Sequence, residues 1–461
     1  MSNRNWSCAN DRGAQDAFVA AMEDLGGDAV GRVEAWEAIQ NSTAIIHGEP
    51  VLGAFMPKLF TEGAYGCLAG VARRVHRILT AVTARYRTDA AYRALFGFDE
   101  RLEALIVESH RGPLIPIMRA DIFLNEETGA FKFCEFNADG SSGINEDREV
   151  LAAIEPTATF QRFAADFTVE GNELFDSWID SFAAAVRGGW GRPLAGPVAI
   201  VDYADAATLS EIAVYEEAFR ARGIAASFVD IRDLTYAGGV LRDGEGTAVD
   251  AVWRRCVPCD LLERWDESSA FVAAVRDGVV PVVGGFASAV AHDKRTFCVL
   301  RHPATRPLVS EEDWLFLEET IPLTLPLDEQ AAASAEILSD KDRWIIKPVD
   351  GYGARDIHAG CTCAAEEWEA TVRRLAAGPG RYVVQEYVRP YRSLLVPAFS
   401  AEELRAVAPG VLPGVPGCGM AHNLTGLYVF NGAMSGIYSR LGMGKVISGD
   451  YTAASVRVRP R

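Results

Sequence analysis

Two neighbouring apolar-rich runs that carry an unusual set of polar residues constrain the fold of this chain most strongly. Residues 114–124 (LIPIMRADIFL) and 130–137 (AFKFCEFN) flank the five residues Asn-Glu-Glu-Thr-Gly. Two such runs joined by a short loop that contains glycine are typical of a β-hairpin. The sequence therefore predicts two antiparallel strands here.

The expected register brings four polar side chains together. If Leu124 faces Ala130, position 119 lies opposite 135 and position 121 lies opposite 133. Because side chains alternate along a strand, one face of the hairpin then carries Arg119, Asp121, Glu135 and Asn137. The other face is expected to hold an ordinary core set: Met118, Ala120, Ile122, Cys134 and Phe136.

The polar set has two interpretations. Carboxylate and amide oxygens are the hard ligands that Mg²⁺ prefers, and Mg²⁺ commonly completes its shell with water and phosphate. One hypothesis is a site for one or two Mg²⁺ ions that bridge nucleotide phosphates, with Arg119 neutralising charge on the group in transfer. The alternative is a solvated hairpin face with an Arg119–Glu135 cross-strand pair.

Composition excludes some classes of protein. The chain has 461 residues and a formal net charge of −18, and a long acidic chain without a Lys/Arg cluster argues against a nucleic-acid surface. No apolar run approaches the length of a membrane span, and the first residues, MSNRNWSCANDRG, lack the apolar segment of a signal peptide. We expect a cytoplasmic protein that binds neither membrane nor nucleic acid.

The nine cysteines form no evident disulfide framework, since their number is odd and they are scattered. We expect most of them to be reduced core thiols. Cys256–Cys259 and Cys361–Cys363 have close spacings, but no histidine follows either pair at ligand spacing, so a zinc site is not favoured.

The chain divides into five expected parts. From residue 196, strand and helix patterns alternate, which predicts a small doubly wound α/β domain. No GxGxxG follows its first strand, so no dinucleotide site is expected. The parts are 1–110, mainly helical; 111–190, the core hairpin and helices; 196–300, the α/β domain; 305–395, a lid; and 396–461, strands that return to the core.

Two lysines stand where a phosphate is expected. Lys294 opens a helix after a strand, where a cation can reach a phosphate over the edge of a sheet, although a solvated lysine is equally consistent. Lys347 ends the strand 343–347, and the loop after it contains Gly351 and Gly353. Such a loop suits a lid that closes over phosphates and excludes water.

Two further segments belong to the same expected site. The end of a strand at Gln385, Glu386, Tyr387 and Val388 forms a natural hinge around an adenine. Asn431-Gly432 between two apolar runs predicts a hairpin with a type I′ turn. Arg440 ends its second strand, where it could face phosphate.

Together these motifs resemble the circularly permuted ATP-grasp ligases, and are similar to the synthetase part of glutathionylspermidine synthase. The resemblance covers roughly residues 115–445. It rests on these segments: Arg119-Ala-Asp121, the run 134–139 (CEFNAD), Asp293-Lys294, the run 347–353 (KPVDGYG) and the run 383–387 (VVQEY). The acidic residues precede the lysines, whereas in an unpermuted ATP-grasp protein they follow them.

The resemblance implies a mixed α/β fold, with a pre-ATP-grasp domain and a lid, and a use for each residue. Asp121, Glu135 and Asn137 would hold Mg²⁺, and Arg119 would stabilise the transferred phosphoryl group and the oxyanion that follows. Lys294 and Lys347 would contact the phosphates of ATP, and the residues from Gln385 to Val388 would flank its adenine.

The implied reaction is ATP-dependent formation of an amide or peptide bond through an acyl phosphate, which must be shielded from water. The expected partners are a small-molecule carboxylate and an amine: an amino acid, a peptide or a polyamine. No room exists before residue 110 for the amidase of bifunctional relatives. A non-catalytic ATP-binding regulatory protein and a small-molecule kinase are the alternatives. The identity of the substrates, the oligomeric state and the phosphate that each lysine contacts stay open.

Overall fold

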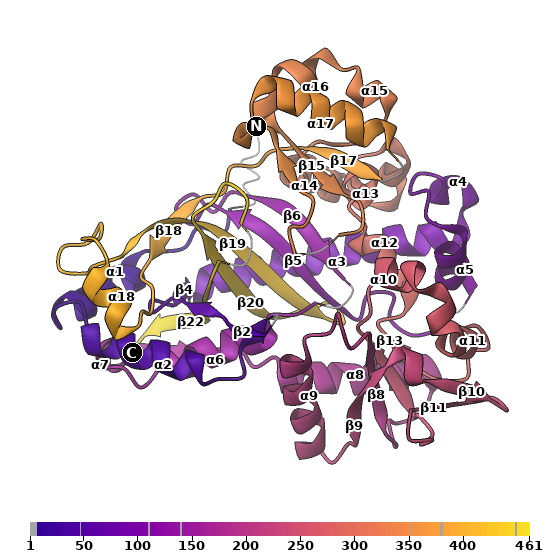
Figure 1. Cartoon of the computed structure of the whole chain (residues 1–461), viewed down its shortest axis with the longest axis horizontal. Helices are drawn as coiled ribbons and strands as arrows, with labels where there is room; N and C mark the ends of the chain where they lie inside the picture. Colours follow the sequence, from indigo (N-terminus) through magenta and orange to yellow (C-terminus); the bar gives the residue numbers. More distant parts are fainter. Residues whose placement is uncertain are drawn as a thin grey trace.

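The computed structural model describes residues 7–46, 48–108, 111–138, 141–351, 353–378, 381–447 and 450–461. Figure 1 shows a long central sheet, a helical and sheet-bearing lobe above it that carries α15–α17, and a smaller lobe at the lower right that carries β8 and β9. The predicted mixed α/β class is confirmed.

The central sheet joins the first hairpin to the last one. β5 (Ile117–Leu124) pairs with β6 (Phe131–Asn137) on one side and with β19 (Gly419–Phe430) on the other, and all of these pairs are antiparallel. The sheet continues through β20 (Ala433–Gly442), β21 (Tyr451–Ala453) and β3 (Leu52–Gly53), and β18 (Arg392–Leu395) adds to β19. Segments some 300 residues apart in the chain are therefore neighbours in this sheet.

The hairpin register differs from the expected one. Leu124 pairs with Phe131, Asp121 with Glu135 and Arg119 with Asn137, and the register shifts between Asp121 and Ile122. The expected pairs 119–135 and 121–133 are therefore wrong. A β-bulge at Cys134 places one extra residue on β6 and accounts for one of the two residues of this difference. The other arises at the loop, where Leu124 pairs with Phe131 instead of Ala130.

The bulge also changes the face on which Cys134 lies. The expectation that Cys134 belongs to the core face is wrong, because it lines the polar side, and Phe133 is buried in the core instead. Arg119, Asp121, Glu135 and Asn137 nevertheless share one face, as expected. The two register shifts add up to two residues, and side chains two residues apart on a strand point to the same face.

A long helix covers the other face of the sheet. α3 (Glu62–Thr88) places one apolar stripe against β19 and β20, and the same core contains Met118, Ala120, Ile122 and Phe136 of the hairpin. The predicted turn at Asn431-Gly432 is confirmed, since both residues have positive φ, 46° and 87°.

Other helices and short strands surround this core. The N-terminal elements are α1 (Gly13–Glu23), α2 (Ala29–Gln40), β1 (Ile45–Ile46), β2 (Glu49–Pro50), β4 (Lys58–Thr61), α4 (Ala90–Arg93) and α5 (Glu100–Glu108). After the hairpin come α6 (Ile144–Ile154), α7 (Ala158–Asp166), β7 (Phe167–Glu170) and α8 (Phe175–Trp190). The last strand, β22 (Ser455–Pro460), pairs with both β4 and β7.

A second, parallel sheet lies in the lower lobe (Figure 1). Its strand order is β13 (Val282–Val283), β12 (Ala251–Arg254), β8 (Val198–Asp202) and β9 (Ala226–Asp230). The helices of this segment are α9 (Leu209–Ala221), α10 (Pro258–Glu263), α11 (Ser269–Arg276), α12 (Ala289–His292) and α13 (Arg295–Leu300), and a small hairpin is formed by β10 (Thr235–Ala237) and β11 (Val240–Arg242).

The upper lobe is built on a third sheet, which is antiparallel. Its order is β14 (Thr324–Pro326), β17 (Tyr382–Glu386), β15 (Trp344–Pro348) and β16 (His358–Ala359). Trp344 and Trp368 are fully buried beneath α15 (Glu329–Ala332), α16 (Ala335–Ser339) and α17 (Ala365–Ala377). α14 (Glu311–Thr320) packs against β6, and α18 (Ala401–Ala406) lies at the left-hand end of the molecule in Figure 1. No helix within the described ranges is long and apolar enough to cross a membrane.

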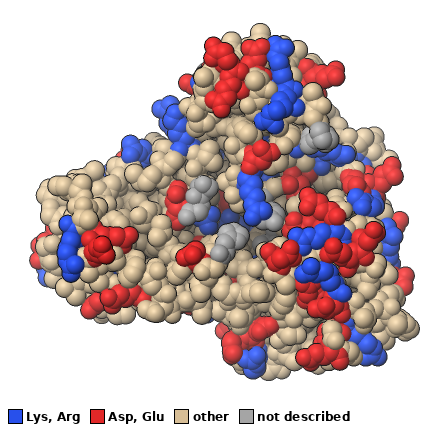
Figure 2. Space-filling model, in the orientation of Figure 1, with Lys and Arg blue, Asp and Glu red and all other residues tan. Residues whose placement is uncertain are grey.

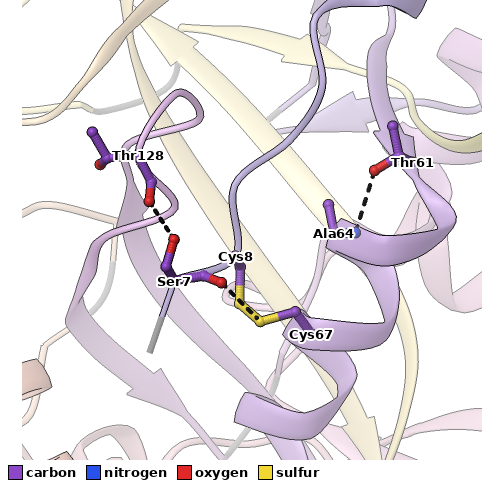
Figure 3. The surroundings of a disulfide bond; sticks show 6 residues. All are labelled: Ser7, Cys8, Thr61, Ala64, Cys67 and Thr128. Carbon is purple, nitrogen blue, oxygen red and sulfur yellow. Dashed lines mark hydrogen bonds between the residues drawn. A yellow bond between two sulfur atoms is a disulfide. The ribbon is translucent and has the colours of Figure 1, made fainter. Parts of the chain in front are cut away.

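One disulfide attaches the N-terminal segment to α3. Cys8 is bonded to Cys67 (Figure 3), and the other seven cysteines are free. The expectation of mostly reduced thiols is confirmed, but this pairing was not predicted. The backbone N–H of Cys8 donates to Gly129 O (2.9 Å), and the Ser7 hydroxyl donates to Thr128 O. The first described residues therefore pack on the loop that joins β5 to β6.

The pairing predicts a thiol count. The chain unfolded without reductant should react with a thiol reagent at seven cysteines, and at nine after reduction. Ellman titration measures both numbers. Cys67→Ser should leave eight thiols in either condition, and nine reactive thiols in the unreduced wild type would contradict the disulfide.

Candidate active site

A buried ion pair on β5 is the centre of the polar face. Arg119 donates from Nε to Asp121 Oδ1 (2.7 Å) and from Nη2 to Asp121 Oδ2 (2.9 Å), because residues two apart on a strand point the same way. Its Nη1 donates to Ser142 O (2.7 Å). The guanidinium also lies over the Tyr438 ring, at 4.8 Å from the centroid. This arrangement fixes the guanidinium in one position.

The neighbouring strand supplies a second carboxylate beside the first. Asn137 Nδ2 donates both to Asp121 Oδ2 (3.0 Å) and to Glu135 Oε1 (3.2 Å). The pairing of Asp121 with Glu135 across the two strands places these oxygens side by side. The structure thus brings together all four residues that the sequence singled out.

The third strand leaves room for this cluster by means of a glycine. Gly426 on β19 pairs with Asp121, and a Cβ at this position would lie 2.7 Å from both Asp121 Oδ1 and Arg119 Cδ. No real side chain accepts such contacts without displacing its neighbours. Sequence reasoning missed Gly426, since only the pairing of β19 with β5 reveals its role.

Two lysines approach the cluster from other segments. Lys294 Nζ lies 3.9 Å from Glu135 Oε2 and donates to Gly351 O (2.7 Å). Lys347 Nζ donates to Gln385 Oε1 (2.8 Å) and to Cys134 O (3.1 Å). Both lysines are buried, so their charges act in a medium of low dielectric constant.

These cations determine the charge of the carboxylates. Burial raises the pKa of Glu135, but Lys294 and Lys347 outweigh it and lower that pKa to about 2. Burial raises the pKa of Asp121, and Arg119 opposes that rise. Burial opposes the charge of Arg119 too, yet Asp121 keeps the pKa of this guanidinium well above its usual value. Glu135 and Arg119 therefore remain ionised at neutral pH.

A cavity of about 490 Å³ opens over this cluster. Figure 2 shows the hollow near the middle of the face, below the upper lobe. The residues singled out in the sequence that line it are Arg119, Asp121, Glu135, Asn137, Lys347, Gly353, Gln385, Glu386, Tyr387, Val388 and Arg440. Lys294 and Gly351 do not line it themselves. Lys294 lies beside Glu135, which does, and Gly351 accepts a hydrogen bond from Lys294.

Several of these residues also make contacts that hold the cavity together. The Gln385 amide bonds to both Lys347 and Thr324 (2.8 and 2.9 Å), so its side chain is already engaged. Tyr387 donates its hydroxyl to Lys445 O (2.7 Å). Arg440 donates to the Tyr438 hydroxyl (2.5 Å) and lies 3.7 Å from Glu146 Oε2. Gly353 has a φ of +65°, which favours glycine in this loop.

Sequence reasoning missed the part of the lining contributed by the parallel sheet. This part includes Asp202, Glu211, Arg255, Asp260 and His292. Asp202 ends β8 and Arg255 follows β12. The rule that ligands bind at the carboxyl ends of parallel strands could have identified both positions.

The donor set fits a magnesium ion. The described residues contain no cluster of three or more His, Cys, Asp or Glu side chains that could hold a metal. Mg²⁺, however, usually takes only one or two protein carboxylates and completes its shell with water and phosphate. Asp121 and Glu135, with the Asn137 amide beside them, supply that number of hard oxygen ligands.

Comparisons with known proteins agree with this geometry. Residues 207–408 match the sequence profile of a family described as circularly permuted ATP-grasp type 2. Proteins of the ATP-grasp family are generally ATP-dependent carboxylate–amine ligases. No curated protein sequence matches the chain.

One similar solved structure resembles the whole fold. A glutathione synthetase-like effector (GSS30) from Globodera pallida, in its apo form, superposes with a TM-score of 0.52 at 12% identity, over 94% of this chain and 97% of that one. At this identity the likeness shows the fold alone. D-cycloserine synthetase DcsG is 23% identical over 42% of this chain and 60% of its own, but its TM-score of 0.28 carries no argument.

The close approach of β19 gives a test of the cluster. Gly426→Ala should lower the free energy of unfolding by about 1–3 kcal/mol, the usual effect of inserting a methyl group where no space exists. Denaturant titration measures the difference. Gly419→Ala on the same strand is the matched control, since nothing lies within 4 Å of its Cβ. Equal stability of the two variants would show that Gly426 does not border the ion pair.

Proposed function

We propose that this chain, whose residues 207–408 belong to the circularly permuted ATP-grasp type 2 family, is an ATP- and Mg²⁺-dependent ligase that joins a carboxylate to an amine. The observation that carries the proposal is the arrangement of an Arg119–Asp121 pair, a second ionised carboxylate and Lys347 on one cavity, with the buried Lys294 3.9 Å from Glu135. A solvated hairpin face would leave these groups exposed and separate.

Binding of ATP follows from the placement of cations and strand ends. Lys347 on β15 and Lys294 at the start of α13 would contact the phosphates, whose charge needs such partners in a buried site. The strand end from Gln385 to Val388 lines the cavity and would flank the adenine. The loop with Gly351 and Gly353 would cover the phosphates and exclude water.

Magnesium would be held by Asp121, Glu135 and Asn137. When bound, Mg²⁺ neutralises phosphate charge and so makes the terminal phosphorus easier to attack. The low pKa of Glu135 keeps that carboxylate available as a ligand at neutral pH.

The reaction would take place in two balanced steps. An oxygen of the substrate carboxylate attacks the γ-phosphorus, an O–P bond forms, and ADP leaves. The amine then attacks the acyl carbon, the C–N bond forms, phosphate leaves, and the amine loses a proton. Arg119, held by Asp121, would stabilise the negative charge on the transferred phosphoryl group and then on the tetrahedral oxyanion.

Product analysis tests this proposal against its rivals. The chain is incubated with ATP, Mg²⁺ and a panel of amino acids, peptides and polyamines, and we expect ADP, phosphate and a product with the mass of an amide. A stable phosphorylated product would indicate a small-molecule kinase. ATP binding without turnover of any substrate would indicate a regulatory protein, and AMP with pyrophosphate would contradict the acyl-phosphate route.

Replacement of the central arginine measures its contribution. Arg119→Lys keeps a cation near Asp121 but loses the planar fork, and should lower turnover roughly 10²–10³-fold, as for the loss of one electrostatic stabiliser. ADP release in a coupled assay provides the measurement. Lys132→Gln on the same hairpin is the control, because its side chain bonds to Glu319 O outside the cavity. A near-wild-type rate for Arg119→Lys would remove Arg119 from the mechanism.

A further inference from the structure

The end of the cavity that borders the parallel sheet has no part in the proposed binding of ATP. It is lined, among other residues, by Asp202 at the carboxyl end of β8, by Arg255 directly after β12 and by Glu211 in the first turn of α9. Two of its charged groups are buried and incompletely paired, and such groups are unfavourable unless a ligand or water satisfies them.

Arg254 and Arg255 are consecutive, and both are buried, but they have different surroundings. Arg254 donates to Gly284 O, to Cys256 O (2.6 Å) and to Ser288 Oγ (3.2 Å), so its guanidinium holds the local backbone. Arg255 is only 3% exposed and donates from Nη2 to Glu211 Oε2 (3.1 Å). Its Nε and Nη1 have no hydrogen-bond partner within the part of the chain that the structure describes.

Glu211 orients Arg255 without fully balancing its charge. The other oxygen of Glu211, Oε1, accepts from the backbone N–H groups of Gly143, Ile144 and Asn145 (3.1, 2.9 and 3.1 Å) at the start of α6. The carboxylate is therefore shared between a helix N-terminus and Arg255. A second anion that accepts from the unpartnered Nε–H or Nη1–H groups of Arg255 would complete the balance.

The same loop connects Arg255 to the centre of the active site. Ser142 O accepts from Arg119, and the next residue, Gly143, donates to the glutamate that holds Arg255. The two guanidinium groups thus lie on either side of one short loop and line one cavity. A single small molecule is therefore able to reach both.

Asp202 supplies the opposite charge nearby. It lines the cavity, is 8% exposed, and accepts the Tyr203 N–H at Oδ1 (2.9 Å). It makes no ion pair with any lysine, arginine or histidine among the described residues. Burial raises its pKa to about 6, and Arg255 opposes that rise.

We propose that Arg255 and Asp202 form a subsite for the α-amino-acid end of a substrate. An unpartnered N–H group of Arg255, on Nε or Nη1, would donate to the α-carboxylate, and Asp202 would bind the α-ammonium group. An ammonium held in this way has no lone pair, so the group that reacts at Arg119 belongs to the other end of the same molecule. This inference rests on the proposed function, and selects a bifunctional amino acid or a peptide rather than a polyamine.

Binding calorimetry on the full chain, with Mg²⁺ and a non-hydrolysable ATP analogue, tests the subsite without turnover. The probes are aspartate, glutamate, ornithine, lysine, γ-glutamylcysteine and, as polyamines, putrescine and spermidine. The tightest amino-acid or peptide probe is compared with its α-amide and with its analogue that lacks the α-amino group. Loss of the carboxylate charge or of the α-amino group should each weaken binding roughly 10–100-fold, since a hydrogen bond to a charged group contributes about 1.5–3 kcal/mol.

Two conservative variants separate binding from a structural role. Arg255→Lys keeps a cation beside Glu211 but removes the unpartnered N–H groups of the guanidinium. It should therefore abolish the preference for the α-carboxylate over the α-amide. Asp202→Asn should abolish the preference for the compound that has the ammonium group. Arg220→Lys and Asp205→Asn, exposed residues of the same lobe, are the controls and should bind as the wild type does. The affinity for the ATP analogue should stay unchanged in all four variants.

The outcomes distinguish the subsite from the ligase. Equal weakening of the acid and the amide by Arg255→Lys, or no binding by any amino-acid or peptide probe, would overturn the subsite. Turnover with polyamines alone, at a rate that neither variant changes, would also overturn the subsite but would not contradict the proposed ligase activity. Arg255-dependent binding of an amino acid without any ADP release would support the subsite and overturn the ligase. Should Arg255→Lys fail to fold, as a melting curve would reveal, Asp202→Asn alone decides.

Discussion

The Arg119–Asp121 pair is the interaction around which the rest of the cavity is arranged. A buried ion pair is costly unless its hydrogen bonds are complete, and a charge left alone in such a place is costlier still. Here the Asn137 amide donates to Asp121, the Ser142 carbonyl accepts from Arg119, and the Arg119 guanidinium lies over the Tyr438 ring. The pair needs the close approach of β19 at Gly426, so the central sheet and the cluster depend on each other.

The charged groups around this pair also balance one another. Glu135 adds a second negative charge, and Lys294 and Lys347 lower its pKa. Lys347 lies on β15 of the upper lobe, and Lys294 directly precedes α13, which packs against β14 of the same lobe. Each lysine is fixed by a carbonyl or amide oxygen, Lys294 by Gly351 and Lys347 by Gln385. The cations of the proposed phosphate site are thus positioned before any nucleotide binds, which reduces the reorganisation that binding requires.

The sequence predicted the parts of the site that depend on local pattern. Alternation along two strands was sufficient to place Arg119, Asp121, Glu135 and Asn137 on one face, and Asn431-Gly432 was recognisable as a turn signal. The register was wrong because neither the longer loop, where Leu124 pairs with Phe131, nor the β-bulge at Cys134 leaves a mark in the apolar pattern. Gly426, Glu211 and Arg255 were missed because their roles come from contacts between distant segments.

The central claim is that the carboxylates of this hairpin and the two lysines bind the metal-bound phosphates of ATP. The most direct measurement is a crystal structure with a non-hydrolysable ATP analogue and Mn²⁺, whose anomalous signal locates the ion. We predict an ion that contacts Asp121 and Glu135, with the terminal phosphate beside Arg119 and Lys347. An analogue bound elsewhere, or an ion that touches neither carboxylate, would contradict the account.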